Sequence, residues 1–296
     1  MFFQGSFVAL VTPFNNDHSI DKSALKALVR WHIEQGTDGI VCCGTTGEGI
    51  SLSFDERLEV IKTCVKESNG SIPVIGATTT ANTLESCKLT REAKEIGVDA
   101  TLAVVPYYSR PTDKGVVLHF EKIAEEGLDM IVYENPLRTS KSLLLETFKR
   151  LESIPNVKAI KASVGRKNFQ MIKDTTDIPL FAGDDFITYD LLQLGAVGAI
   201  SVVGNIIPKE WKEMISLCLS NEFEKALLSF LRYKKLLGIL VAETNPQIVK
   251  LALHLLGKID LVYRLPLISP EKKHHESLFD ELVDLNLCNQ STYFGI

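Results

Sequence analysis

A short apolar segment near the middle of the chain reads Val157-Lys158-Ala159-Ile160-Lys161. Its length and its apolar residues are typical of a buried β-strand. Lys161 places an ammonium group where this strand should end. Taken alone, such a lysine is more often a solvent-exposed charge than a functional group, so the rest of the chain must decide between the two interpretations.

Seven other short apolar segments are spread along the chain, and amphipathic stretches follow them. The eight expected strands lie at residues 7–11, 39–43, 73–76, 100–105, 130–133, 157–161, 179–182 and 198–202. Helix-start residues precede the first three amphipathic stretches: Asp21, the pair Ser53 and Glu56, and the pair Asn82 and Glu85. Strands that alternate with helices indicate a parallel sheet covered on both faces.

Eight strand–helix units within residues 1–221 predict a closed (β/α)8 TIM barrel, a fold of the α/β class. No G-x-G-x-x-G pattern follows the first strand, which argues against an open dinucleotide-binding sheet. Residues 222–296 carry two or three further helical patterns and no strand pattern. They predict a C-terminal helical region, appended to the barrel, that suits packing or assembly.

The composition is that of an ordinary globular protein: of 296 residues, 45% are hydrophobic and 23% are charged. The net charge of −5, with both signs interleaved, gives no electrostatic footprint for nucleic acid. The six cysteines form no C-x-x-C pair, so reduced thiols are expected and a metal site is not. Without a signal peptide or an apolar run of about 20 residues, the protein is expected to be cytoplasmic rather than bound to a membrane.

In a (β/α)8 barrel the active site lies at the carboxyl ends of the strands. This rule gathers residues that are far apart in the sequence: Thr45, Thr46, Tyr107, Tyr108, Tyr133, Arg138 and Lys161. The set contains an amine, phenols, hydroxyls and a guanidinium, and it includes no histidine, metal-ligand cluster or obvious carboxylate pair. Such groups favour Schiff-base chemistry on a carbonyl substrate.

Each group has a distinct use in that chemistry. Lys161 must be neutral to attack, and lowering its pKa from ~10.4 to ~7–8 by burial means disfavouring its charged form by roughly 3–4 kcal/mol. A tyrosine can shuttle protons, and an arginine can hold a carboxylate with two bonds. The turn Gly44-Thr45-Thr46-Gly47 offers N–H groups and hydroxyls to a small anion. Each feature also has a structural alternative: the turn can be only a tight turn, the tyrosines can be packing residues and Arg138 a solvated charge.

At this point the chain resembles a known family, the class I pyruvate aldolases that form Schiff bases, typified by dihydrodipicolinate synthase and N-acetylneuraminate lyase. The resemblance runs from Gly5 to about Pro270. It rests on residues 10–14 (LVTPF), 44–48 (GTTGE), 106–111 (PYYSRP), Tyr133, Arg138-Thr139, Ile160-Lys161, 183–185 (GDD) and Asn245-Pro246. The second threonine of the turn, the Tyr-Tyr-x-Arg-Pro segment and Arg138-Thr139 point to the dihydrodipicolinate synthase branch in particular.

The resemblance implies a condensation of pyruvate with aspartate 4-semialdehyde, on the path to diaminopimelate and lysine, in a homotetramer that needs no cofactor. By position, Lys161 would form the imine with pyruvate and Tyr133 would be the general acid/base. Thr45 would link Tyr133 to Tyr108, which would reach in from a neighbouring subunit. Substrate binding would fall to Thr45 and Thr46 for the pyruvate carboxylate, Arg138 for the semialdehyde carboxylate, and main-chain groups near Gly183 and Ile200.

Two positions depart from the family pattern. Relatives usually have asparagine after the strand-five tyrosine and often glutamate after the lysine, whereas this chain has Glu134 and Ala162. Glu134 is expected to place a negative charge near the second carboxylate. Two alternatives therefore stay open: another pyruvate-dependent aldolase or lyase acting on a sugar acid such as N-acetylneuraminate, and a family member that has lost catalysis and serves in binding or assembly.

Overall fold

A computed structural model describes residues 3–289 of the chain. Eight parallel strands form one closed barrel in sequence order, and the last strand pairs with the first. The strands are β1 (Gly5–Ala9), β2 (Gly39–Cys42), β3 (Val74–Gly76), β4 (Ala100–Val104), β5 (Met130–Glu134), β6 (Val157–Ala162), β7 (Leu180–Ala182) and β8 (Gly198–Ser201). The (β/α)8 barrel expected from the sequence is confirmed, with every strand boundary within two residues of its prediction.

The interior of the barrel is filled with side chains. The rings of Phe7 on β1 and Phe181 on β7 meet edge to face, with their centroids 5.4 Å apart. Gly39 on β2 makes room for this pair, because a Cβ at that position would lie 2.1 Å from the Phe7 ring. The chemistry is therefore restricted to the open end of a packed core.

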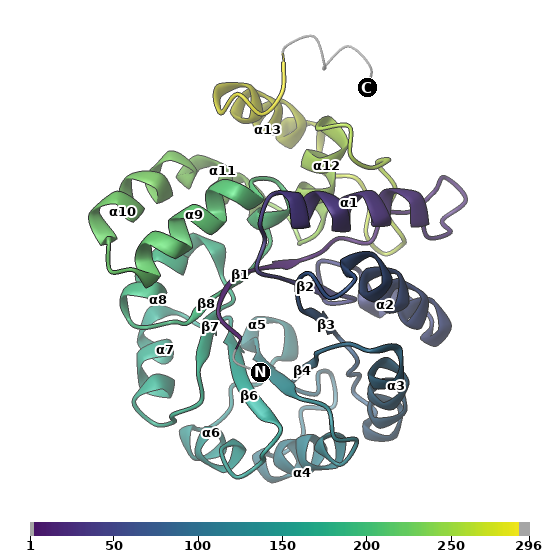
Figure 1. Ribbon diagram of the computed structural model, residues 1–296, viewed down its shortest axis with the longest axis vertical. Helices are drawn as coiled ribbons and strands as arrows, with labels where there is room; N and C mark the ends of the chain where they lie inside the picture. Colours follow the sequence, from purple (N-terminus) through teal and green to yellow (C-terminus); the bar gives the residue numbers. More distant parts are fainter. Residues whose placement is uncertain (1–2, 290–296) are drawn as a thin grey trace.

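The helices that cover the barrel form a ring around the strands (Figure 1). They are α1 (Lys22–Glu34), α2 (Phe54–Ser68), α3 (Thr83–Ile96), α4 (Asp113–Ala124), α6 (Leu145–Leu151), α7 (Arg166–Lys173), α8 (Thr188–Gln193) and α9 (Pro208–Leu219). The predicted helix starts are confirmed: Asp21 and Asn82 cap α1 and α3, and Ser53 forms a capping box with Glu56 on α2. The segment between β5 and α6 is not a plain loop, because Glu134 ends β5 and Pro136–Thr139 form a short helix, α5.

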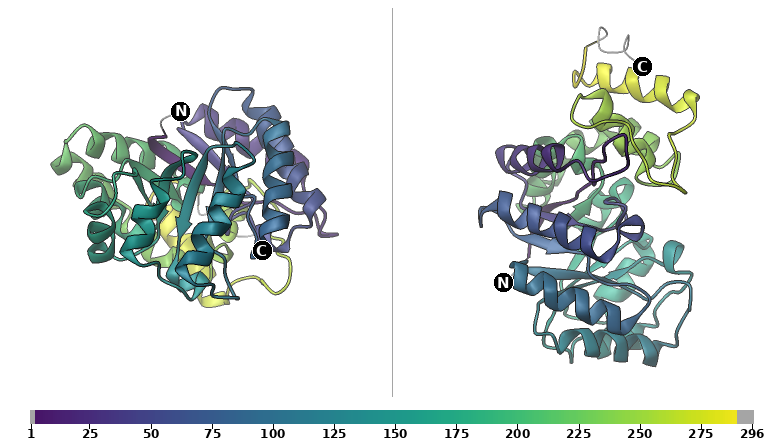
Figure 2. Two further views of the ribbon diagram at one scale, coloured as in Figure 1. Left: turned by 90° about the horizontal axis from the view of Figure 1, so that it is seen from below. Right: turned by 90° about the vertical axis from the view of Figure 1, so that its right-hand side faces the viewer.

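The chain after residue 221 forms more helices than the two or three predicted. Within its described part, which ends at residue 289, these are α10 (Phe223–Arg232), α11 (Lys234–Leu240), α12 (Gln247–Leu255) and α13 (Lys272–Asp284). The predicted region extends to residue 296, and residues 290–296 lie outside the described residues. Figure 2 shows α12 and α13 stacked at one side of the barrel, and α12 contacts the 3-10 turn Val203–Asn205 that follows β8.

Two further features concern the chain as a whole. All six cysteines are free thiols, and five of them are buried. Between residues 3 and 289, none of the helices combines the length and apolar character that a membrane span requires.

Candidate active site

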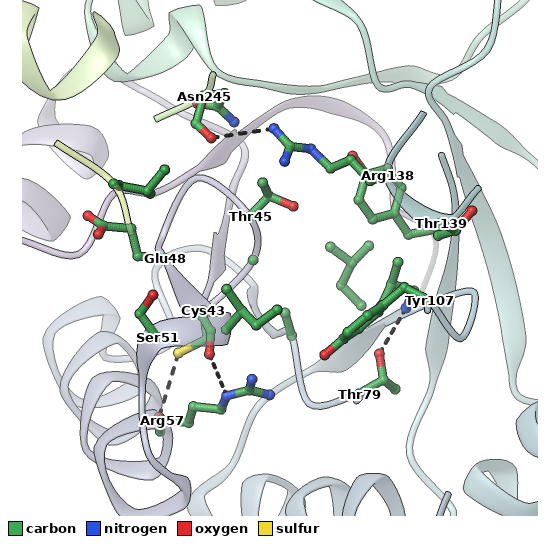
Figure 3. Close-up of a pocket in the computed structure, with 18 of the residues that line it drawn as sticks. Cys43, Thr45, Glu48, Ser51, Arg57, Thr79, Tyr107, Arg138, Thr139 and Asn245 are labelled. Carbon is green, nitrogen blue, oxygen red and sulfur yellow. Dashed lines mark hydrogen bonds between the residues drawn. The ribbon is translucent and has the colours of Figure 1, made fainter. Parts of the chain in front are cut away.

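A cavity of about 270 Å³ opens at the carboxyl ends of the strands. Thr45 after β2, Tyr107 after β4, Tyr133 on β5 and Arg138 on α5 all line it. Figure 3 shows Thr45, Tyr107 and Arg138 around one hollow, with Asn245 from the C-terminal region at its rim. Residues separated by about 200 positions thus surround the same space, as the carboxyl-end rule for barrels requires.

Lys161 and Tyr133 lie side by side near the carboxyl ends of β6 and β5. Tyr133 lines the cavity, whereas Lys161 is packed beside it and is not one of the lining residues. The two are direct partners in the register of β5 and β6, and the lysine Nζ lies 4.4 Å from the centroid of the tyrosine ring. Only 6% of Lys161 is exposed, so its amine is largely shielded from water. Within residues 3–289 no carboxylate forms an ion pair with it. The positive charge of Lys161 acts to lower the pKa of Asp185, but burial is the larger effect and raises that pKa to about 6.

The hydroxyl of Tyr133 has two hydrogen-bond partners. The side-chain amide of Asn135 donates to it at 2.7 Å, and Ser163 Oγ contacts it at 3.5 Å. Burial acts to raise the pKa of Tyr133, but the charge of Lys161 and these hydrogen bonds outweigh it, so the pKa lies below its usual value. A phenol with a lowered pKa is better suited to exchange protons near neutral pH.

Arg138 reaches across the mouth of the cavity. Its Nη2 donates to the main-chain carbonyl of Asn245 at 3.4 Å, and Asn245 Nδ2 donates to Thr46 Oγ1 at 3.0 Å. The Oδ1 atom of Asn245 is buried and has no hydrogen-bond partner among the described residues. These bonds join α5, the C-terminal region and the turn after β2 into one rim.

A buried ion pair fixes the turn after β2. Glu48 and Lys250 are both fully buried and lie 2.5 Å apart. Burial acts to lower the pKa of Lys250, and Glu48 opposes that effect. The second carboxylate oxygen of Glu48 accepts the N–H of Arg264, and Thr12 bonds the Gly47 carbonyl. The turn that carries Thr45 and Thr46 is therefore fixed by contacts from both ends of the chain.

Not every predicted site residue faces this cavity. Tyr108 is 95% exposed, with a left-handed φ of 65°, and it is not one of the residues that line the cavity. No hydrogen bond joins Thr45 to Tyr133 or Tyr108 in the part of the chain that the structure describes. Gly183 follows β7 and accepts a bond from Ser163, whereas Ile200 is fully buried in β8, where it pairs with Phe7.

Glu134 corrects an expectation drawn from the sequence. Successive strand residues face opposite sides, so Glu134 points away from the side that Tyr133 occupies. Its Oε1 accepts the N–H of Leu143 at 3.0 Å, and burial raises its pKa to about 7. Glu134 and Ala162 are register partners, so the two departures from the family pattern are neighbours on the outer face of the barrel, not additions to the substrate pocket.

Three contributors escaped the sequence reasoning. Asn135 and Ser163 form hydrogen bonds with Tyr133. In the sequence they are only an asparagine before Pro136 and a serine two positions after Lys161, and neither pattern predicts such a contact. Arg57 on α2 also lines the cavity, where its Nε donates to the Gly49 carbonyl. Its position on a helix gave no indication that it would face the site.

Comparison with known proteins agrees with this geometry. The model of the dihydrodipicolinate synthetase family matches residues 2–284. A 4-hydroxy-tetrahydrodipicolinate synthase from Persephonella marina is 43% identical over 291 residues, which is 96% of this chain and 99% of the relative. One from Sulfurihydrogenibium sp. is 43% identical over 288 residues, covering 95% and 97% of the two chains.

Solved structures give the same result. The dihydrodipicolinate synthase of Aquifex aeolicus superposes with a TM-score of 0.94 at 38% identity, covering 97% of this chain and all of that one. A chloride-inhibited dihydrodipicolinate synthase from Acinetobacter baumannii, complexed with pyruvate, has the same TM-score at 40% identity and covers 96% and 99% of the two chains. On the strength of the family model and of relatives that match almost end to end, this chain belongs to the dihydrodipicolinate synthetase family.

Proposed function

We propose that the chain is a lyase that condenses pyruvate with L-aspartate 4-semialdehyde to give 4-hydroxy-tetrahydrodipicolinate, in the biosynthesis of diaminopimelate and lysine. The observation that carries this proposal is the buried amine of Lys161 above the ring of Tyr133, at the mouth of a barrel whose relatives carry that activity. A cytoplasmic location and the absence of a cofactor belong to the same proposal.

In the proposed reaction, the neutral amine of Lys161 attacks the ketone carbon of pyruvate, and loss of water gives an iminium ion. The iminium draws electrons from the adjacent methyl carbon, which loses a proton and becomes an enamine. The enamine carbon attacks the aldehyde of the second substrate. The amine of that substrate then displaces Lys161 from the imine carbon, which closes the ring and frees the lysine. Tyr133 carries the protons between these steps.

Two anion sites belong to the proposal. The N–H groups and hydroxyls of Thr45 and Thr46 suit the pyruvate carboxylate, and main-chain groups near Gly183 and Ile200 are proposed to contribute on the side of Lys161. Arg138 lies across the mouth and suits the carboxylate of the semialdehyde, because its planar fork can donate two bonds. A neutral sugar tail has less use for that guanidinium, which favours the semialdehyde over a sugar acid.

Assembly is the second part of the proposal. Tyr108 is almost fully exposed beside the cavity, and Leu84 on α3 and Leu118 on the neighbouring α4 are also exposed. An aromatic and two leucines exposed on adjoining elements suit a protein–protein contact. We infer a homo-oligomer, a tetramer built as a dimer of dimers, in which Tyr108 of one subunit reaches Thr45 of another. In this arrangement residues 1–221 carry the chemistry and the region from 222 onward supports the rim.

Borohydride trapping tests the imine directly. Reduction in the presence of pyruvate should add the mass of a reduced pyruvate adduct to the peptide that contains Lys161, and Lys161→Arg should abolish the adduct. An adduct on another lysine, or none, would refute the mechanism. Assays with aspartate semialdehyde and with N-acetylneuraminate then separate the two substrate classes, and turnover of the sugar acid alone would refute the substrate assignment.

A further inference from the structure

Asn135 occupies the junction between β5 and α5 and is 92% buried, with an exposed fraction of 8%. Its Nδ2 lies 2.7 Å from the hydroxyl of Tyr133, and its Oδ1 lies 3.3 Å from the backbone nitrogen of Arg138. Its backbone carbonyl accepts the Thr139 hydroxyl at 3.0 Å. One side chain thus contacts both the tyrosine at the centre of the site and the first turn of the helix that carries the arginine.

The orientation of this amide is fixed by its partners. The backbone N–H of Arg138 can only donate, so the side-chain atom that faces it must be the oxygen of Asn135. The amide nitrogen then faces Tyr133, and an amide nitrogen can only donate. The phenol oxygen is therefore an acceptor in this contact, and its own proton is not used in the bond with Asn135.

Ser163 is the weaker of the two partners of Tyr133. A serine hydroxyl has a single proton, and Ser163 also donates to the Gly183 carbonyl at 3.0 Å, against 3.5 Å to the phenol. The shorter bond, to an oxygen that can only accept, takes most of that proton. Asn135 is thus the main fixed donor to Tyr133.

The charged groups around the phenol come from neighbouring elements. Lys161 on β6 and Arg138 on α5 both favour the phenolate. The other titratable side chains that line the cavity are Cys43 and Glu48 after β2, Arg57 on α2 and Tyr107 after β4. Among the described residues none of these groups forms a hydrogen bond with the Tyr133 hydroxyl, so Asn135 is the group that orients it.

We propose that Asn135 is a positioning residue for the reaction: its amide holds the Tyr133 hydroxyl as a hydrogen-bond acceptor and ties it to the start of the helix that carries Arg138. The general acid/base and the second-substrate site are then held as one unit. The inference rests on the proposed function for the catalytic role of Tyr133, but the hydrogen bond itself can be tested without turnover.

Two variants remove the amide that donates to Tyr133 but keep an acceptor that caps α5. Asn135→Ser and Asn135→Asp both keep an oxygen that can cap α5, and neither offers an amide donor to the phenol. Ultraviolet difference titration of each variant, against the same variant carrying Tyr133→Phe, isolates the Tyr133 phenol from the other tyrosines. Loss of the donor should raise the pKa of Tyr133 by about one unit in Asn135→Ser, and by more in Asn135→Asp, where a carboxylate replaces the amide.

In the steady state both variants should lose about tenfold in kcat, with little change in the KM for pyruvate. A residue with only a structural role would lower Tm and leave the phenol titration unchanged, so an unshifted titration in a folded variant overturns the inference. If the serine variant does not fold, the aspartate variant, which has the stronger cap, gives the same readout. Failure of the proposed function would appear separately, because the wild-type protein would then form no pyruvate adduct.

Discussion

The amine of Lys161 lies 4.4 Å from the centroid of the Tyr133 ring, and the two residues are register partners on adjacent strands. Their separation is set by the spacing of neighbouring strands, about 4.8 Å in a sheet, and not by a flexible loop. The proposed nucleophile and the proposed proton carrier are therefore held by the barrel strands themselves.

Tyr133→Phe should reduce kcat by 10²-fold or more, because it removes the proton carrier and leaves the Lys161 amine in place. Stability should fall by only about 1–2 kcal/mol, the cost of leaving the Asn135 amide without its acceptor. Steady-state kinetics and thermal unfolding measure the two effects. Tyr107→Phe, which changes another phenol of the same cavity, is the matched control. An equal loss in both variants would contradict the assignment of Tyr133.

Arg138→Lys should raise the KM for the second substrate by on the order of tenfold, since a lysine keeps the charge but loses the planar fork. The KM for pyruvate and the yield of borohydride adduct should not change. Arg150→Lys is the control, because it makes the same change at an exposed position near the end of α6 that does not line the cavity. A rise in the pyruvate KM instead would show that Arg138 serves the first carboxylate.

Lys250→Met should destabilise the protein by about 3–5 kcal/mol, because Glu48 would stay buried without its partner. The double variant Glu48→Gln/Lys250→Met should recover most of that loss, and chemical denaturation measures both. The same single change should raise the KM for pyruvate, since the turn that carries Thr45 and Thr46 rests on this pair. A double variant as unstable as the single one would show that the pair contributes by shape rather than by charge.

Glu134 should make the protein less stable as the pH rises, which is the reverse of the usual effect of a carboxylate. Its pKa rises from 4.5 to about 7 on folding because it is buried, so the folded state binds a proton that the unfolded state releases between these values. The stability from the protonated form is complete below about pH 4.5 and is lost as the pH rises towards 7 and above, by up to about 3 kcal/mol.

Glu134→Gln should remove this component of the pH dependence, as measured by urea denaturation at pH 5, 6.5 and 8. Glu121→Gln, at an exposed position on α4, is the control and should leave the profile unchanged. Because Glu134 faces away from the cavity, the KM for the second substrate should also be unaffected. A large change in that KM would contradict the orientation of Glu134.

Subunit exchange tests the inferred role of Tyr108. Tyr108→Ala and Lys161→Ala homo-oligomers should both be nearly inactive, because each lacks one component of every site. After the two are unfolded and refolded together, mixed assemblies should regain activity, since some sites then combine an intact Tyr108 with an intact Lys161. Two inactive parents with no recovery, in mixtures shown to contain both chains, would place Tyr108 outside its neighbour's site.

The barrel could be predicted from the sequence because each strand is a short apolar run, which is a local signal. The direction of Glu134 could not, because it depends on the exact end of β5: a strand that includes residue 134 turns its side chain outward, whereas a loop leaves it undirected. The comparison with the family pattern led to a wrong expectation for Glu134 for the same reason. The pattern does not show that Glu134 and Ala162 are neighbours on the outer face, since this follows only from the pairing of β5 and β6.

Some residues of the candidate site could likewise be predicted from the sequence, and others could not. Residues at strand ends, such as Tyr133 and Lys161, follow from counting strands. Asn135 acts through a bond made back to a residue two positions earlier, and the partners Glu48 and Lys250 are 202 positions apart. Neither relationship leaves a periodic trace in the sequence, so only coordinates reveal them.

The supports of the turn after β2 come from late in the chain: Asn245 bonds Thr46, Lys250 pairs with Glu48, and Arg264 reaches both Glu48 and Glu56. During synthesis on the ribosome, Lys161 and Tyr133 exist long before these partners have been translated. A nascent barrel, or a chain truncated before residue 245, would therefore contain Lys161 and Tyr133 without the contacts that fix the turn after β2. Translation of the C-terminal region is what completes the border of the cavity.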